Sequence, residues 1–161
     1  KMKKVILIED EQVFYNEIIN AIVRCSGHAF TCVTMPSQEV KLPVLKMEGP
    51  DGFQIIGLSR FSDVQSVDWE NCGANLIISD RGIRGHENNW DYMAKQKLPC
   101  PILLVTASKI ASRERKFAGY KVFDKSSTLQ FGEMIKEACS ILGLPFEDKP
   151  KLPSSSDPRL G

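Results

Sequence analysis

The sequence lacks the cysteine patterns that would assign it to a metal-binding or disulfide-rich class. Its five cysteines, Cys25, Cys32, Cys72, Cys100 and Cys139, are odd in number and scattered, and none form a C-x-x-C pair. This spacing argues against a structural zinc site and against a disulfide framework. It is typical of small buried hydrophobic residues in a reducing compartment, so we expect a cytoplasmic protein.

The chain also lacks a large net charge and long apolar runs. The 21 basic and 20 acidic residues leave a formal net charge of +1, which provides no electrostatic basis for binding nucleic acid. No apolar run approaches the roughly 18 residues that a membrane span requires, and the start of the chain carries no secretory signal pattern. We therefore expect neither direct nucleic-acid binding nor a membrane segment.

Strand-like and helix-like segments alternate along the chain. Short apolar runs that predict strands occupy residues 5–8, 29–35, 76–79, 102–105 and 120–123. Helical periodicity lies between or after them, at 14–25, 90–96, 110–118 and 127–142. The alternation predicts an α/β fold, a five-stranded parallel sheet with helices on both faces. Residues 144–161 are rich in proline and serine and predict a linker or tail.

The second and third predicted strands lie further apart than a helix and a turn require. The excess falls at about residues 36–61, where strand-like runs at 40–47 and 53–58 flank the turn residues 48–52. This arrangement predicts a β-hairpin inserted after the second strand, and a disordered loop is the alternative. Because it follows a parallel strand, the hairpin is expected near the carboxyl edge of the sheet.

Polar residues that can carry chemistry follow four of the strands. Glu9 and Asp10 come after the first, Asp80 after the third, Thr106 after the fourth and Lys125 after the fifth. Each alone has an ordinary structural explanation, such as a helix cap or a turn. Ligands bind at the carboxyl ends of parallel strands, so the whole set is expected to converge in one crevice.

Clustered carboxylates repel one another, and a hard divalent cation relieves that repulsion. Oxygen ligands with several retained waters suit Mg²⁺. We expect Glu9, Asp10 and Asp80 to be its protein ligands, together with the accessible backbone carbonyl of Gly82.

The same set permits phosphoryl transfer. Asp80 is ionised at its ordinary pKa of about 3.9 and can act as a nucleophile without a general base. Mg²⁺ and Lys125 would neutralise charge on the phosphoryl group, and Thr106 would donate a hydrogen bond to it.

Four segments, "VILIEDE", "LIISDRG", "ILLVTAS" and "VFDKSS", resemble the signature segments of the receiver domain of two-component response regulators. The resemblance covers residues 3–35 and about 62–143. It implies a flavodoxin-like, doubly wound (βα)5 receiver domain over 1–143, with Asp80 as the phosphorylation site. It also implies a histidine kinase or phosphotransfer protein as donor, and an output domain or protein target. Such a domain is not an enzyme beyond catalysing its own phosphorylation and dephosphorylation.

Two positions depart from the receiver pattern. Val122 stands where receivers usually have the aromatic residue that couples to the threonine, and Ser126 stands where proline usually follows the lysine. Two alternatives to a phosphorylated receiver stay open. One is a pseudo-receiver that binds proteins without being phosphorylated. The other is a haloacid-dehalogenase-like phosphatase, which is disfavoured because its nucleophile should follow the first strand, whereas Asp80 follows the third.

Overall fold

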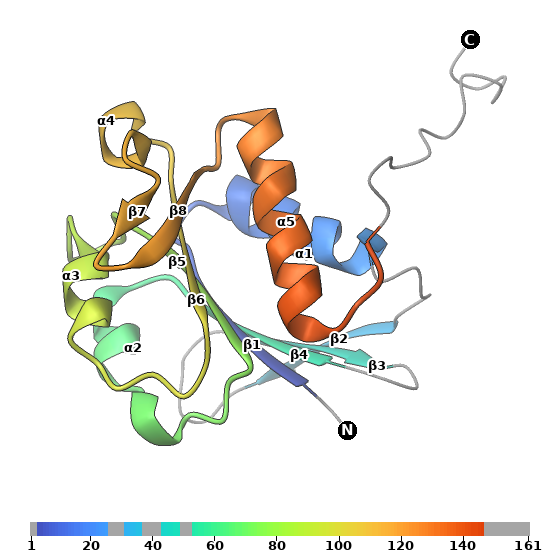
Figure 1. The fold of residues 1–161 in the computed structure, drawn as a ribbon. Helices are drawn as coiled ribbons and strands as arrows, with labels where there is room; N and C mark the ends of the chain where they lie inside the picture. The colour runs from blue at the N-terminus through green and yellow to red at the C-terminus, as the bar shows by residue number, and fades with distance from the viewer. Residues whose placement is uncertain (1–2, 26–30, 37–42, 49–52, 147–161) are drawn as a thin grey trace, which may run out of the picture.

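The computed structural model describes residues 3–25, 31–36, 43–48 and 53–146 (Figure 1). The strands are β1 (Lys3–Ile8), β2 (Thr31–Pro36), β3 (Pro43–Glu48), β4 (Phe53–Leu58), β5 (Leu76–Asp80), β6 (Ile102–Thr106), β7 (Lys116–Phe117) and β8 (Tyr120–Asp124). The helices are α1 (Gln12–Cys25), α2 (Phe61–Gln65), α3 (Asn89–Ala94), α4 (Lys109–Ser112) and α5 (Thr128–Leu142), with one 3-10 turn, η1 (Trp69–Asn71). The predicted α/β class is therefore confirmed.

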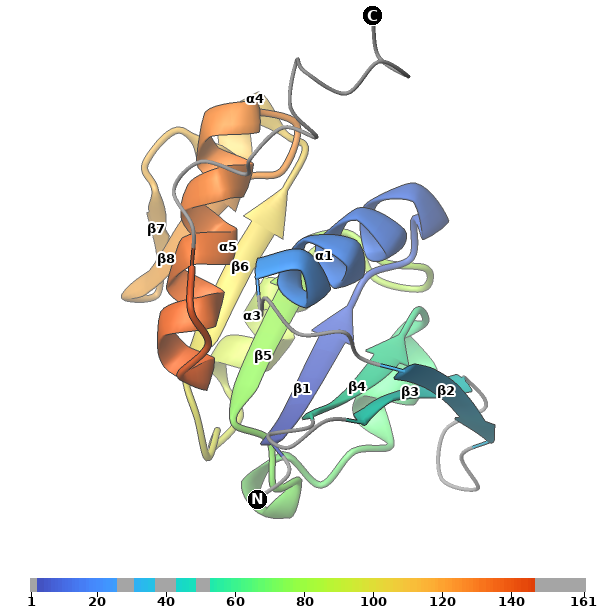
Figure 2. The same ribbon diagram turned by 90° about the vertical axis from the view of Figure 1, so that its right-hand side faces the viewer.

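All the strands belong to one mixed sheet in the order β2-β3-β4-β1-β5-β6-β8-β7 (Figure 2). The central strands β4, β1, β5, β6 and β8 are mutually parallel. β2 and β3 extend one edge in antiparallel pairing, and β7 does the same at the other edge. The prediction of a five-stranded parallel sheet is therefore confirmed only in part, because antiparallel strands extend the sheet at both edges.

Helices cover both faces of the central strands. α1 and α5 lie side by side on one face, and α2 and α3 lie on the other (Figures 1 and 2). Alternate residues of β1 face opposite cores: Val5 and Leu7 pack with the α1 and α5 side, whereas Ile6 and Ile8 pack with the α2 and α3 side. This two-sided burial explains why the central strands read as continuous apolar runs.

The region 36–61 is organised differently from the predicted insertion. The strand that pairs with β1 is β4, in parallel register from Lys3 with Phe53 to Ile8 with Leu58. The antiparallel hairpin is instead formed by β2 and β3, outside β4, and so precedes the second parallel strand. Apolar periodicity indicates that a segment is a strand but not which strand it pairs with, so the sequence pattern alone does not predict the order of the strands in the sheet. The predicted turn, 48–52, lies almost entirely outside the described residues.

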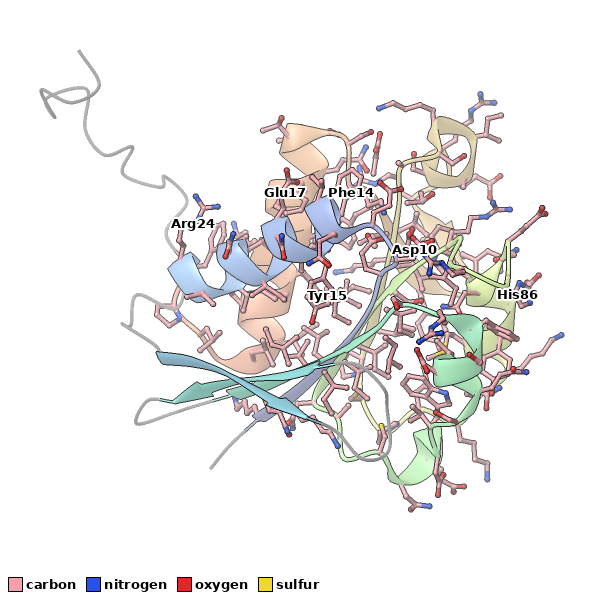
Figure 3. All side chains as sticks on the ribbon, turned by 180° about the vertical axis from the view of Figure 1, so that it is seen from behind. Asp10, Phe14, Tyr15, Glu17, Arg24 and His86 are labelled. Carbon is pink, nitrogen blue, oxygen red and sulfur yellow. The ribbon has the colours of Figure 1, made fainter. Side chains whose placement is uncertain are left out.

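β4, which lies beside β1, packs tightly against α1. Tyr15 points from α1 toward the sheet, whereas Glu17 points away from it (Figure 3). A Cβ atom at Gly57 would lie only 2.3 Å from the Tyr15 hydroxyl oxygen. A larger residue at position 57 would therefore force the Tyr15 side chain to shift.

The predicted helix at 110–118 is mostly absent. α4 ends at Ser112, and the chain then forms the short strand β7, which pairs antiparallel with the following strand β8. Arg115 and Ala118 adopt left-handed φ angles of 61° and 49°, which interrupt a helix. The weak apolar periodicity of this segment could not hold a longer helix against the competing pairing with β8.

The final helix agrees with its sequence signals. The Ser127 side chain accepts a hydrogen bond from the Gln130 amide, and Gly143 ends the helix at a left-handed φ of 69°. No helix among the residues described is long and apolar enough to cross a membrane. Most of the predicted tail, residues 147–161, lies outside the described part of the chain.

If β4 is an integral strand, truncating its buried side chains should be costly. Ile55 is fully buried, so Ile55→Ala should lower the free energy of unfolding by about 2–5 kcal/mol. The neighbouring, partly exposed Gln54 provides the matched control, and Gln54→Ala should change it by no more than ~0.5 kcal/mol. Urea denaturation measures both, and equally small effects would place β4 in a peripheral insertion.

Candidate functional site

Three carboxylates meet at the carboxyl edge of the sheet. Glu9 and Asp10 directly follow β1, and Asp80 is the last residue of the neighbouring β5. One carboxylate oxygen from each residue lies within 4.8 Å of the other two. Glu9 and Asp80 are 2% and 5% exposed, whereas Asp10 is the most accessible of the three and precedes α1 (Figure 3). The predicted acidic cluster therefore exists.

Lys125 joins this cluster from the end of β8. Its Nζ atom lies 2.6 Å from a Glu9 carboxylate oxygen and 3.1 Å from Asp80 Oδ2. The lysine side chain is 1% exposed and its ammonium lies 4.2 Å from the centroid of the Phe14 ring. A single buried cation therefore contacts two of the predicted metal ligands, and the phenyl ring closes one side of the site.

Thr106 lies at the end of β6, the strand between those of Asp80 and Lys125. It is 3% exposed, and its carbonyl accepts a hydrogen bond of 2.9 Å from the Lys125 amide. Its hydroxyl oxygen accepts a hydrogen bond of 3.0 Å from the Ser108 amide. The hydroxyl hydrogen is thus left to donate elsewhere.

Gly82 occupies the exposed turn that follows β5, two residues beyond Asp80. The Arg81 amide between them donates 2.9 Å to Asp80 Oδ1 and also bonds the Val105 carbonyl of β6. This pairing holds the start of the turn against the sheet. A ligand role for the Gly82 carbonyl remains a prediction.

The charges within the site do not balance. Burial, followed by the nearby Glu9 carboxylate, raises the pKa of Asp80 to about 8, even though Lys125 acts in the opposite direction. Burial acts to lower the pKa of Lys125, but Asp80 and Glu9 outweigh it and raise that pKa above its ordinary value. The ammonium therefore stays charged, but its single positive charge cannot balance two ionised carboxylates.

This donor set fits a hard divalent cation. Three carboxylates supply only oxygen atoms, which Mg²⁺ prefers, and the accessible Asp10 leaves room for retained waters. Extra positive charge would offset the repulsion between Glu9 and Asp80 that one lysine leaves unbalanced. The residues present are therefore compatible with the predicted metal.

Several supporting residues were not identified from the sequence. The Asn89 side-chain amide donates 2.8 Å to the Ser79 hydroxyl, and the Trp90 indole donates 3.0 Å to the Ser79 carbonyl. Both residues belong to α3 and brace the strand immediately before Asp80. The polar pair Asn88-Asn89 before an apolar tryptophan signals a helix start, but it does not reveal which backbone the side chains contact.

Comparison with known proteins does not identify the chain. No protein-family model matches it, and no curated protein matches it. One similar solved structure, described as a trimeric coiled coil of yeast Spc42 fused to another structure, has a TM-score of 0.48 and 16% identity. The match covers 89% of this chain and 78% of that one. Likeness at this level carries no argument about fold or function.

The raised pKa of Asp80 predicts a pH-dependent stability penalty in metal-free buffer. Below about pH 4 both the folded and unfolded states hold the proton. From there to about pH 8 the unfolded chain loses it first, so the contribution of Asp80 to stability falls as pH rises. Asp80→Asn should therefore stabilise the protein increasingly over this range, reaching on the order of a few kcal/mol.

Chemical denaturation with a chelator present, repeated across this pH range, measures the difference. Asp68→Asn, at an exposed carboxylate outside the site, is the matched control for the loss of one carboxylate. A difference for Asp80→Asn that does not change with pH would show that burial does not perturb the Asp80 carboxyl.

Proposed function

We propose that this chain is a phosphorylatable receiver domain of a two-component response regulator. In this proposal Asp80 accepts a phosphoryl group from a histidine kinase or phosphotransfer protein with Mg²⁺, and the domain then changes conformation for signalling. The single observation that carries the proposal is the buried Lys125 ammonium, which contacts Glu9 and Asp80 within one acidic cluster.

The topology supports the proposal. Numbered along the chain, the parallel strands β4, β1, β5, β6 and β8 have the spatial order 2-1-3-4-5. That order is the flavodoxin-like one, in which ligands bind beyond the carboxyl ends of the strands. The acidic cluster, Thr106 and Lys125 all lie at those ends. We infer a flavodoxin-like core whose two edges carry antiparallel additions.

Each residue has a role in the proposed transfer. An Asp80 carboxylate oxygen attacks phosphorus, the phosphorus–nitrogen bond of the donor phosphohistidine breaks, and the electron pair leaves with the imidazole nitrogen. Lys125, already at Asp80 Oδ2, neutralises charge on the transferring group. The Thr106 hydroxyl hydrogen donates to a phosphoryl oxygen. Glu9, Asp10 and Asp80 would hold Mg²⁺, whose charge would favour the ionised, nucleophilic form of Asp80.

Exposed apolar side chains around the site support a protein donor. Among the described residues, the large hydrophobic side chains that are exposed are Val13, Ile110 and Leu129, at 67%, 79% and 74%. Each is the second residue of a helix, α1, α4 and α5 respectively, that begins at the edge carrying Asp80. A partner approaching Asp80 would cover apolar surface on all three helices.

One observation favours the second candidate, a receiver-like module that is never phosphorylated. With a pKa of about 8, Asp80 is mostly protonated at neutral pH when no metal is bound, and a protonated carboxyl is a poor nucleophile. The two candidates therefore differ in whether a divalent cation converts Asp80 into its reactive form.

Labelling with a small phosphodonor separates these candidates. Incubation with phosphoramidate and Mg²⁺ should add one phosphoryl group to the wild-type protein and none to Asp80→Asn. Lys125→Met should slow labelling by about 100-fold, because a charge-stabilising donor is lost. Asp91→Asn, at an exposed carboxylate on α3, should label like the wild type. Intact-protein mass spectrometry over time measures all four; unlabelled wild type would favour the non-phosphorylated module, and labelled Asp80→Asn would move the site elsewhere.

Mg²⁺ binding should be weak and should depend on Asp10. A site that retains several waters and has few protein ligands is modest in affinity, and Asp10→Ala removes its most accessible ligand. The Trp90 indole bonds the backbone beside Asp80, so tryptophan fluorescence should follow the titration. Asp10→Ala should weaken binding by about 10-fold or more. The Asp68→Asn control should titrate like the wild type, and an unchanged curve for Asp10→Ala would place the ion away from this cluster.

A further inference from the structure

The turn that carries Lys125 is built around its neighbour Asp124. The Asp124 side chain is 3% exposed. Its Oδ1 atom accepts hydrogen bonds of 2.9 Å from the Ser126 amide and 2.6 Å from the Ser126 hydroxyl. The bond from residue i+2 defines an Asx-turn, which constrains the backbone on both sides of Lys125.

The backbone groups of Asp124 bind the same turn to the start of α5. Its amide donates 2.8 Å to the Gln130 side-chain oxygen, and its carbonyl accepts 3.1 Å from the Ser127 amide. Ser127 and Gln130 are also the capping residues of α5. Every polar group of Asp124 other than Oδ2 is therefore hydrogen-bonded to the turn after β8 or to the first turn of α5.

The remaining atom, Asp124 Oδ2, contacts α4. Lys109 Nζ lies 2.5 Å from it, and the lysine side chain is 73% exposed although its partner is buried. Burial acts to raise the pKa of Asp124, but the bonds from Lys109 and Ser126 outweigh it and hold that pKa below its ordinary value. A buried carboxylate needs such partners, because an unpaired charge in this position would be costly.

Lys125 is thereby held at both ends. Its amide donates to the Thr106 carbonyl, and its ammonium reaches Glu9 and Asp80. No proline follows it to stiffen the turn, because residue 126 is serine. The Asx-turn supplies the constraint that the proline ring would otherwise provide.

We propose that Asp124, locked by Lys109, is a positioning residue that aims the Lys125 ammonium at Asp80. Asp124 contacts none of the reacting atoms itself and acts through the turn. Its effect on phosphoryl transfer rests on the proposed function, whereas its effect on the Lys125 ammonium does not.

The first test needs no phosphoryl transfer. In protein carrying nitrogen-labelled lysine, the buried Lys125 ammonium should give an exchange-protected NMR signal, assigned by its loss in Lys125→Met. Asp124→Ala should abolish that protection, and Lys109→Met should weaken it while Lys109→Arg restores it. The control is Lys121→Met, which breaks the Lys121–Glu137 ion pair of 2.9 Å on the same strand and should leave the signal unchanged. A protected signal in folded Asp124→Ala would overturn the proposal.

The second test uses the phosphorylation rate. With phosphoramidate and Mg²⁺, Asp124→Ala should lower the maximal rate by about 10-fold to 100-fold, with little change in the half-saturating donor concentration. In the Lys125→Met background the same substitution should add less than about a twofold loss, because its effect passes through the missing lysine. Equal losses in both backgrounds would overturn a positioning role. Denaturation curves establish that every variant is folded under assay conditions.

The two proposals fail in different ways. If the wild type is not labelled but Asp124→Ala still releases the ammonium, the proposed function fails and the positioning role stands. If the wild type is labelled and Asp124→Ala changes neither the NMR signal nor the rate, the positioning role fails and the proposed function stands.

Discussion

The contact of one buried ammonium with two carboxylates is the interaction on which the rest of this site depends. Lys125, Glu9 and Asp80 come from the ends of three different strands, β8, β1 and β5. They meet only because these strands run parallel in one sheet and end at the same edge. Moving any of the three by one register position would leave a charge buried without a partner, which a protein of ordinary stability cannot tolerate.

The same interaction leaves the site short of positive charge. Two buried carboxylates share one ammonium, and burial together with the nearby Glu9 carboxylate raises the pKa of Asp80 in spite of that ammonium. Electrostatic repulsion between buried carboxylates is typical of functional sites, because it lowers stability and a sequence selected for stability alone would replace one of the carboxylates. It connects metal binding, reactivity and stability, since additional positive charge would change all three together. The apolar cores on both faces of the sheet supply the stability that offsets the cost of burying these carboxylates.

Away from the site, the fold departs from a purely parallel sheet, but the carboxyl edge that carries the acidic cluster keeps its parallel strands. The β2–β3 hairpin extends the sheet beyond β4, and β7 folds back on β8, so both additions lie outside the parallel strands that carry the acidic cluster and the lysine. Lys109, the first residue of α4, also contacts Asp124. The surroundings of Lys125 therefore include an ion pair that the sequence did not predict.

The sequence by itself determined the α/β class, the carboxylates at two strand ends, and the caps of α5, because apolar runs, turn residues and capping residues act locally. It did not determine which strand pairs with β1, because Thr31–Pro36 and Phe53–Leu58 read equally as strands and pairing is a contact between distant residues. Nor did it show that Lys116–Phe117 would pair with β8 rather than continue a helix. The partners of Asp124 and Lys125 were likewise decided only by tertiary structure, since ion pairs and buried hydrogen bonds depend on distances that arise when the sheet assembles.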